Sequence, residues 1–385
     1  MKNMIKLSLV AAVAVAGFST AASASTLKEA FANGKVKGQI DSMYFMKDKE
    51  TGTNKDSSIW VNGGKISYTT ASYNGLTAGV TFQTSHVASD NDIQNNYAGD
   101  MDASGSVMSE AYLAYTLNNT TAKIGRQFIS TPLLAGSGSR MIKESFEAAL
   151  LVNTDLPNTT LVAGVINKYQ TRTDSANSGS VGTFENLGDG VYTVYGKNTS
   201  VDNLTIQGQY ATYQEVSANT DYDLVYVDAA YKLDMVTLAA QAHFSDNGAA
   251  TNSDGSLYGV KATAKLDAVT LTAAYTTTDD EAAVVRGVGE AAYKTFTAVG
   301  HTSGGFSYRA DTDSFMLAAS AKVADFALKL AYGNYDVAAN SEDVEETNFI
   351  VGYSFNKELS AKVSYSVYDG YSYDNRVRTY LSYKF

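Results

Sequence analysis

Apolar and polar residues alternate one by one through most of this chain. In the stretch 76–82 every second residue is apolar, and the same period of two recurs at 236–244 and 359–367. A period of two places neighbouring side chains on opposite faces of a β-strand, whereas an amphipathic helix repeats its apolar residues at three and four positions. The pattern therefore predicts a protein built almost entirely of strands.

The alternating segments number about eighteen, and most have the ~9–11 residues that a tilted strand needs to cross a bilayer. They lie near 35–45, 61–71, 75–86, 107–117, 121–129, 146–153, 159–169, 190–199, 202–213, 222–233, 236–245, 256–266, 269–278, 312–323, 325–335, 346–355, 359–369 and 374–385.

The connections between these segments alternate between short and long. Every second connection is a turn of about three residues, such as 73–75 or 266–268, and the others are long and polar, such as 87–106 and 279–311. Short periplasmic turns and long outer loops are typical of bacterial outer-membrane barrels, in which an even strand count closes the ring. We therefore predict an all-β fold, a transmembrane antiparallel β-barrel of about 18 strands.

The first 24 residues follow a different pattern. Lys2 and Lys6 flank a basic start, 7–18 is apolar, and Ala22-Ser-Ala24 forms a small-residue cleavage site. Because the apolar run is shorter than the ~20 residues of a membrane helix, we predict a signal peptide at 1–24 rather than an anchor. The segment 25–385 is then a single barrel domain, which begins with a short helical turn.

Composition agrees with an exported barrel. The chain has 2 Pro and 27 Tyr, which suits long paired strands and aromatic belts at the membrane interfaces. It has no Cys, so disulfides do not stabilise it. The net charge of −11 becomes more negative once the two lysines of the signal peptide are removed, which argues against nucleic acid as a partner.

Alternation also assigns the charges to faces. If apolar residues face lipid, the lumen receives mostly cations, which would favour the passage of anions and carboxylates. The alternative is that these lysines only solvate the interior and balance scattered acids. The inferred lumen cations are Lys37, Lys65, Lys123, Lys261, Lys322, Lys329, Lys362 and Arg378, and the inferred lumen acids are Asp41 and Asp228. The excess acid falls in predicted outer loops, at Asp90, Asp92, Asp100, Asp102, Asp279, Asp280, Glu281, Glu342, Asp343, Glu345 and Glu346.

Signatures of catalysis and of cofactor binding are missing from the sequence. His86, His243 and His301 have no metal-ligand spacing, and the sequence contains no D-x-D-x-D-G motif of the kind that binds calcium. There is no G-x-S-x-G elbow, and the Gly-rich stretch 136–140 lacks the G-K-[ST] of a P-loop. We therefore expect no enzyme activity, no cofactor and no metal.

Within the stretch from Ala122 to Leu150, the strands are interrupted by a loop that carries Pro132, Gly136 and Gly138. Its motifs are Lys123-Ile-Gly-Arg-Gln127, Thr131-Pro132, Ser139-Arg140-Met141 and Ser145-Phe146-Glu147. They resemble the OprD-type outer-membrane porins, which carry G-x-Q, T-P, S/T-R-L-L-P and T-F-x-G in this order. The terminal Phe385 also fits, and the chain is similar to the major outer-membrane porins of campylobacters and their relatives. It departs from the OprD pattern at Met141-Ile142-Lys143, which replaces Leu-Leu-Pro, and at Ala148, which replaces the family's Gly.

The resemblance implies that the third outer loop, near 130–147, folds inward and narrows the pore. Arg140 and Lys143 would then be cations at the constriction. Arg126 is kept as a third candidate, although alternation gives it the outward parity of Ile124. An alternative is that Arg140 pins the loop to the wall through Glu110 or Glu144.

The expected function is that of a porin of the Gram-negative outer membrane, a passive channel for ions and small hydrophilic solutes. The expected partners are membrane lipid, lipopolysaccharide and the solutes, with no nucleic acid, and the assembly is a homotrimer or a monomer. The alternatives are a substrate-selective channel for organic acids or amino acids, and a structural or adhesive surface barrel whose long loops do the work.

Overall fold

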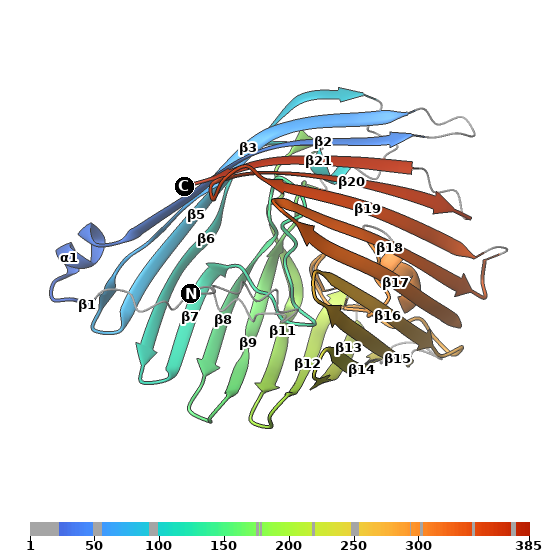
Figure 1. Ribbon diagram of the computed structural model, residues 1–385. Helices are drawn as coiled ribbons and strands as arrows, with labels where there is room; N and C mark the ends of the chain where they lie inside the picture. Colours follow the sequence, from blue (N-terminus) through green and yellow to red (C-terminus); the bar gives the residue numbers. More distant parts are fainter. Residues whose placement is uncertain are drawn as a thin grey trace.

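The structure is a computed structural model that describes residues 23–48, 56–91, 99–174, 177, 179–217, 220–247, 254–292, 294–300, 303–340, 343–370 and 375–385. Within these residues, eighteen long antiparallel strands form one closed barrel (Figure 1). The ring closes where β2 (Lys35–Asp48) pairs with β21 (Asn375–Lys384), from Gln39 opposite Lys384 to Asp48 opposite Asn375. The predicted fold is confirmed.

The other barrel strands follow one another around the ring in chain order. They are β3 (Ser57–Thr69), β5 (Leu76–Asn91), β6 (Ala103–Leu117), β7 (Thr120–Gln127), β8 (Ser145–Asn153), β9 (Thr159–Gln170), β11 (Phe184–Asn198), β12 (Leu204–Ser217), β13 (Thr220–Leu233), β14 (Val236–Asn247), β15 (Gly255–Leu266), β16 (Val269–Thr278), β17 (Thr312–Val323), β18 (Phe326–Val337), β19 (Val344–Ser354) and β20 (Leu359–Asp369). The smaller elements are β1 (Ser23–Ala24), β4 (Ser72–Tyr73), β10 (Gly179–Ser180), the helix α1 (Leu27–Ala32) and the 3₁₀ turns η2 (Gly99–Met101) and η3 (Ser303–Tyr308).

The N-terminal helical turn is present as predicted. Thr26 caps α1, because its hydroxyl accepts a hydrogen bond of 3.2 Å from the Glu29 N–H. Residues 1–22 of the predicted signal peptide lie outside the described residues, so the signal peptide stays a prediction. In the described part of the chain, no helix is long and apolar enough to cross a membrane.

Side-chain alternation places the faces as the sequence suggests on most strands. On β14, Leu238 and Phe244 are exposed on the outside, while Gln241 and His243 are buried on the inside. At the C-terminus, the outward Phe385 exchanges two backbone hydrogen bonds with Gly38 on β2, of 2.8 and 3.0 Å. The last residue therefore helps to close the ring.

The short turns depend on residues that tolerate a left-handed backbone. Asn74, Asn118 and Asn158 have φ of 50°, 52° and 53°, and Asp234 and Asp267 have φ of 47° and 46°. Asn and Asp occupy this region at low cost among non-glycine residues. Their spacing along the sequence therefore marks one end of the barrel, which we take as the periplasmic end.

Strict alternation fails where loops cover the inner wall. Phe45, Ile59 and Val61 point inward on β2 and β3 although they are apolar, and each is fully buried. They form one cluster with Met141 from the loop between β7 and β8. The inner wall is apolar at such places because a loop, and not water, lies against it.

Candidate pore constriction

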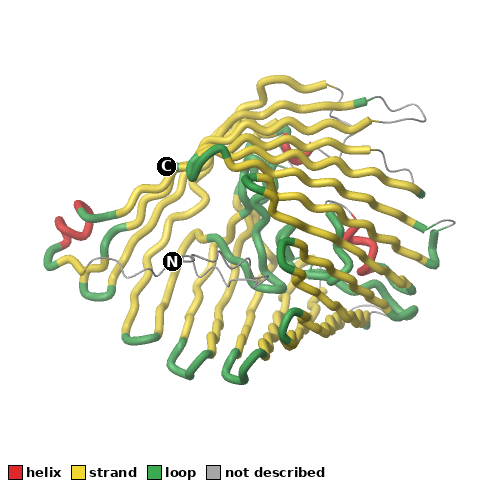
Figure 2. Tube along the Cα trace, in the orientation of Figure 1, coloured by secondary structure: helices red, strands yellow, loops and turns green. Residues whose placement is uncertain are grey.

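The loop between β7 and β8, residues 128–144, crosses the inside of the barrel; we name it the constriction loop (Figure 2). Near its start, the Leu133 N–H donates a hydrogen bond of 2.7 Å to Gln209 Oε1 on β12. Near its end, the Lys143 N–H and C=O bond to the Gln83 side-chain amide on β5, at 2.9 and 2.8 Å. The loop is therefore fastened to two separate parts of the wall, as the resemblance implied.

The tip of the constriction loop is a small hairpin. Ser130 and Ala135 form a β-bridge, and the Gly136 N–H donates to the Ile129 carbonyl at 3.1 Å. A side chain at Gly136 would meet the Glu144 carbonyl at 2.4 Å, so the two arms of the loop can approach only with glycine here.

A second loop meets the constriction loop inside the barrel. It is the connection from β16 to β17, residues 279–311, and we name it the inner loop. Its Val288 forms a β-bridge with Leu134, supported by the hydrogen bonds Val288 N–H to Leu133 C=O and Ala135 N–H to Val288 C=O, both 3.0 Å. Gly287 permits the approach, because any Cβ there would collide with the Leu133 backbone.

The inner loop also covers the wall from β14 to β18. The Tyr335 hydroxyl on β18 donates to the Thr297 carbonyl at 2.7 Å, and Phe296 packs under the Lys261 ammonium on β15. The sequence suggested a long loop on the outside, available for adhesion, and the described part of 279–311 differs from that expectation. Val284, Val299, Phe306 and Tyr308 of this loop are buried against inward-facing side chains.

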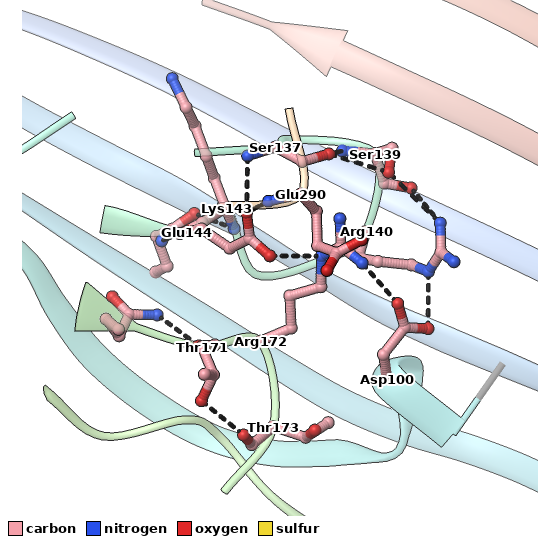
Figure 3. Close-up of polar contacts among 12 residues, drawn as sticks. Asp100, Ser137, Ser139, Arg140, Lys143, Glu144, Thr171, Arg172, Thr173 and Glu290 are labelled. Atoms are coloured by element: carbon pink, nitrogen blue, oxygen red, sulfur yellow. Dashed lines mark hydrogen bonds and ion pairs between the residues drawn. The ribbon is translucent and has the colours of Figure 1, made fainter. Parts of the chain in front are cut away.

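An ion-pair network ties four loops together (Figure 3). Asp100, in the connection from β5 to β6, accepts from Arg140 Nε at 2.7 Å and from Arg172 Nη1 at 2.5 Å. Arg172, which follows β9, also pairs through Nε with Glu144 Oε1 at 3.2 Å. Glu144 Oε2 accepts from the backbone N–H of Ser137 at 2.8 Å and of Glu290, in the inner loop, at 3.0 Å. The network therefore holds the constriction loop and the inner loop in one arrangement.

The environment sets the protonation of both acids. Burial alone would raise the pKa of Asp100, but Arg140 and Arg172 outweigh it and hold that pKa below the usual value. At Glu144, burial is the larger effect, and it raises the pKa although Arg172 and two backbone N–H groups act against it.

Arg140 therefore anchors the loop more than it faces the pore. Its side chain is only 7% exposed, and its guanidinium lies 5.0 Å from the Phe45 ring centroid. Arg378 on β21 lies over the same ring at 4.8 Å and is fully buried. The alternative that Arg140 pins the loop agrees with this geometry, with a different carboxylate: Asp100, and not Glu110 or Glu144, is the partner.

The predicted lumen lysines divide into two kinds. Lys123 is buried, lies 3.9 Å from Glu110 Oε1 and covers the Tyr112 ring, so its charge is balanced. Lys65 on β3, Lys143 on the constriction loop and Lys362 on β20 are partly or fully exposed. None of these three ammonium groups forms an ion pair with a described residue.

Two further predicted lumen residues, Asp41 and Lys261, also point inward. Asp41 on β2 is buried and accepts from the Gln39 amide at 2.8 Å and from the Ser382 hydroxyl. Lys261 on β15 is half-buried, with its ammonium 3.8 Å from the Phe296 ring centroid.

Arg126 is a correction, because it lies outside the lumen. The register of β7 runs without a bulge through Arg126, which therefore keeps the outward parity of Ile124. Its side chain is 37% exposed, lies 3.5 Å from Glu147 and covers the Phe184 ring.

Two acids assigned to the outer loops are also corrections. Asp100 lies inside, between two arginines, and Glu346 is fully buried on the inward face of β19, beside Asn348. Asp92 and Glu342 lie outside the described residues. Sequence reasoning missed Asp100, Arg172 and the inward path of 279–311. For the last of these, Gly287-Val-Gly289 was a usable signal, since two glycines around one apolar residue suit a close backbone contact.

Comparison with known proteins agrees with this geometry. The family model for "outer membrane porin, OprD family" matches residues 35–331. The chain belongs to the OprD family of outer membrane porins. This OprD-family protein is therefore an outer-membrane channel.

Solved structures show the same fold at low sequence identity. Acinetobacter baumannii OccAB1 is 17% identical, with a TM-score of 0.76 over 93% of this chain and 98% of that one. Pseudomonas aeruginosa OccK3 (OpdO) is 15% identical, with a TM-score of 0.72 over 93% and 97%. Pseudomonas aeruginosa OpdK, solved with vanillate, is 14% identical, with a TM-score of 0.73 over 92% and 99%. A search of curated proteins found no match.

Proposed function

We propose that this porin passes small anions, carboxylates above all, in preference to cations, and that lysines rather than arginines select them. Passage needs no covalent chemistry, since the lumen acts on solutes only through its width and its charge. The observation that carries the proposal is the set of Lys65, Lys143 and Lys362, which line the interior without an ion pair to any described residue.

These lysines lie where a passing solute can meet them. Lys143 belongs to the constriction loop itself, and its ammonium lies 4.1 Å from the Phe128 ring centroid. Lys65 is close enough for its charge to act on Lys143. Lys362 lies against the Tyr380 ring, at 3.9 Å from its centroid. An aromatic ring beside an ammonium holds the side chain in place without neutralising its charge.

Substrate selectivity is a second candidate function, because two loops narrow the lumen. The contact of the constriction loop with the inner loop leaves less freedom than a single loop would. The neighbour OpdK was solved with vanillate, an aromatic carboxylate, and a basic lumen in this chain suits the same chemical class. Saturable passage of a carboxylate would favour this selective form over general diffusion.

The test is a measurement of ion selectivity in planar bilayers. The wild-type protein should give stepwise conductance and a reversal potential on the anion side in a KCl gradient. Each of Lys65→Gln, Lys143→Gln and Lys362→Gln should lower the anion-to-cation ratio by about twofold to fivefold, as expected for the loss of about 0.5–1 kcal/mol. Arg126→Gln is the control, because it removes a cation from the outer face. An unchanged reversal potential in the triple lysine variant would overturn the proposal.

The assembly is tested separately. The lipid-facing wall is that of an integral membrane protein, and lipopolysaccharide is its expected neighbour on the outer side. Native mass measurement in detergent distinguishes a monomer from a homotrimer, the two assemblies that the sequence suggests.

A further inference from the structure

A row of charged side chains crosses the outside of the barrel at the outer ends of β7, β8 and β9, which are neighbours in the wall (Figure 1). It consists of Arg126, Glu147 and Lys168, which the register sets directly opposite one another, and we name it the outer row. Glu147 lies between the two cations, 3.5 Å from Arg126 Nε and 3.8 Å from Lys168 Nζ. Since the three side chains are 34% to 37% exposed, they can contact molecules outside the barrel.

A β-bulge turns Lys168 outward. Ile166 is fully buried on the inner face, and strict alternation would place Lys168 on that face too. The register of β9 against β8 skips Asn167, because Ile166 pairs with Ala148 and Lys168 pairs with Glu147. One extra residue reverses the face, and bulges of this kind redirect a side chain. The outer row therefore depends on a local departure from the regular strand.

An apolar groove of about 820 Å³ lies on the outer face, on the periplasmic side of the outer row. It begins with the next outward row of side chains, in which Ile124, Ala149 and Val165 pair across the same three strands. Small side chains such as Ala149 and Ala163 hollow the groove between larger neighbours such as Tyr192 on β11. Because the groove faces the membrane and is lined by apolar residues, it suits a hydrocarbon chain.

Elsewhere, the outer ends of the strands carry acids on the outer face. The Tyr210 hydroxyl on β12 donates to Asp223 Oδ1 on β13 at 2.8 Å. In the same way, the Tyr275 hydroxyl on β16 donates to Asp313 Oδ1 on β17 at 2.7 Å. Such acids repel an anionic head group, whereas the outer row offers two cations for one carboxylate. The outer row is therefore better suited to an anion than these pairs are.

The chemistry of the two cations favours phosphate. A guanidinium binds phosphate oxygens in pairs through donors in one plane, and an ammonium adds a point charge. Arg126 Nη1 donates to the Met108 carbonyl at 3.3 Å, and the guanidinium lies 4.2 Å from the Phe184 ring centroid. These contacts hold the guanidinium beside the groove. Since neighbouring strands are about 4.8 Å apart, the backbones of Arg126 and Lys168 are about 10 Å apart, which one phosphorylated head group can span.

The position of the outer row identifies the leaflet of the membrane. Arg126 lies near the end of β7 at which the chain enters the constriction loop, and the short periplasmic turns lie at the opposite end. A lipid of the outer leaflet would therefore place its head group at the outer row and its acyl chains along the groove. In the Gram-negative outer membrane, that leaflet consists mainly of lipopolysaccharide, whose lipid anchor combines phosphates with several acyl chains.

We propose that the outer row and the groove beside it bind one lipopolysaccharide molecule at a fixed place on the barrel. Arg126 and Lys168 bind a phosphate of the lipid anchor, and an acyl chain lies along Ile124 and Ala149. Glu147 keeps the two cations on either side of the position that the phosphate takes. The site lies outside the barrel, so it does not rest on the anion passage proposed above.

The test is the binding of lipid A with two phosphates to the folded porin in detergent, measured by native mass spectrometry. Arg126→Gln/Lys168→Gln should weaken binding about tenfold, as expected for the loss of two charge-assisted contacts. Lys28→Gln/Lys357→Gln is the matched control, because it removes two exposed lysines at the periplasmic end, and it should change binding less than about twofold. Ala149→Leu partly fills the groove and keeps both cations, and it should weaken binding about threefold.

Two lipids identify the ligand. Lipid A without its phosphates should bind the wild type about as weakly as lipid A with two phosphates binds the double variant of the outer row. Phosphatidylglycerol has a single phosphate and two acyl chains, and it should bind at least about fivefold more weakly than lipid A. Equal binding of phosphatidylglycerol would overturn the assignment to lipopolysaccharide.

Two further results would overturn the site itself. One is lipid A binding that the double variant of the outer row leaves unchanged. The other is an equal loss of binding in the periplasmic control, which would show a general effect of charge. Both readouts are independent of the reversal potential, so this site and the proposed anion selectivity can each fail without the other.

Discussion

The arginines and the lysines inside this barrel occupy contrasting places. Arg140, Arg172 and Arg378 are nearly or fully buried, and the first two share the carboxylate of Asp100. Lys65 and Lys143 are only half-buried and have no ion pair with a described residue. Both kinds of residue are cations in the same lumen, yet their environments differ in burial and in pairing.

The difference follows from the chemistry of the two side chains. A guanidinium presents several donors in a rigid plane and is weakly hydrated, so it can bridge carboxylates and backbone in a buried place. An ammonium is strongly hydrated and gains from staying near water. We therefore expect the arginines to fix the loops, and the lysines without an ion pair to carry the charge that a solute meets.

The largest expected effect comes from removing the shared acid. Asp100→Ala leaves Arg140 and Arg172 without their common partner, and breaking a buried pair in this way costs about 3–5 kcal/mol. We expect a mobile constriction loop, seen as larger single-channel current noise and faster proteolysis within 128–144. Asp90→Ala is the control, since Asp90 is an exposed acid at the outer end of β5. Quiet, wild-type current in Asp100→Ala would show that the network does not hold the loop.

Low pH should reproduce part of the loosening of the constriction loop expected for Asp100→Ala. Since Arg140 and Arg172 hold the pKa of Asp100 below its usual value of 3.8, the pair stabilises the docked loop fully above about pH 4 and loses its contribution as the pH falls through the lowered pKa. Glu144 acts in the opposite sense, because its raised pKa favours the protonated acid in the folded protein. Current noise should therefore rise below about pH 4 in the wild type, and Asp100→Asn should show no such rise in that range. A transition near neutral pH would point to another group.

A smaller effect is expected when charge is kept and shape is changed. Arg140→Lys retains the cation but has no planar fork with which to hold Asp100, so we expect a loss of about 1–2 kcal/mol in loop docking. The reversal potential should stay close to that of the wild type, while current noise increases. A shift in selectivity as large as that of Lys143→Gln would break the distinction between anchoring arginines and selecting lysines.

The smallest effect is expected on the outer face. Arg126 and Glu147 form an exposed pair, and such pairs contribute about 0–1 kcal/mol. Arg126→Gln should leave conductance and selectivity unchanged and should lower the unfolding temperature by no more than a few degrees, measured by heat-induced mobility shift in gels. A change in ion selectivity would contradict the outward position of Arg126 and would place its side chain in the pore.

Local pattern was enough to predict the barrel. Alternation of apolar and polar residues in segments such as 236–245 shows directly which face meets lipid. Side chains of a strand alternate between two faces, and apolar residues are favoured on the face that contacts the membrane. Asn and Asp at the short turns mark the chain reversals, since few other residues accept their backbone angles. These signals are local, so one sequence suffices to read them.

The constriction depended on contacts that no local pattern contains. Asp100 lies among other loop acids in the sequence, and only the fold brings it to Arg140, forty residues away. The apolar inward residues Phe45 and Val61 contradict alternation because the constriction loop covers them. Motif resemblance located that loop, but it could not distinguish an anchoring Arg140 from a selecting one, since both roles use the same residue at the same place.

The apolar part of the inner wall that packs against Met141 bears on how passage of solutes through this porin is regulated. If the constriction loop swung away, Phe45, Ile59 and Val61 would be exposed to water, at a cost of about 1.5–3 kcal/mol for each side chain. A constriction loop attached in this way is poorly suited to act as a gate. We expect the pore to stay open at all times. A cell would then adjust the flow of nutrients through the number of porin molecules it makes, and not by opening or closing each one.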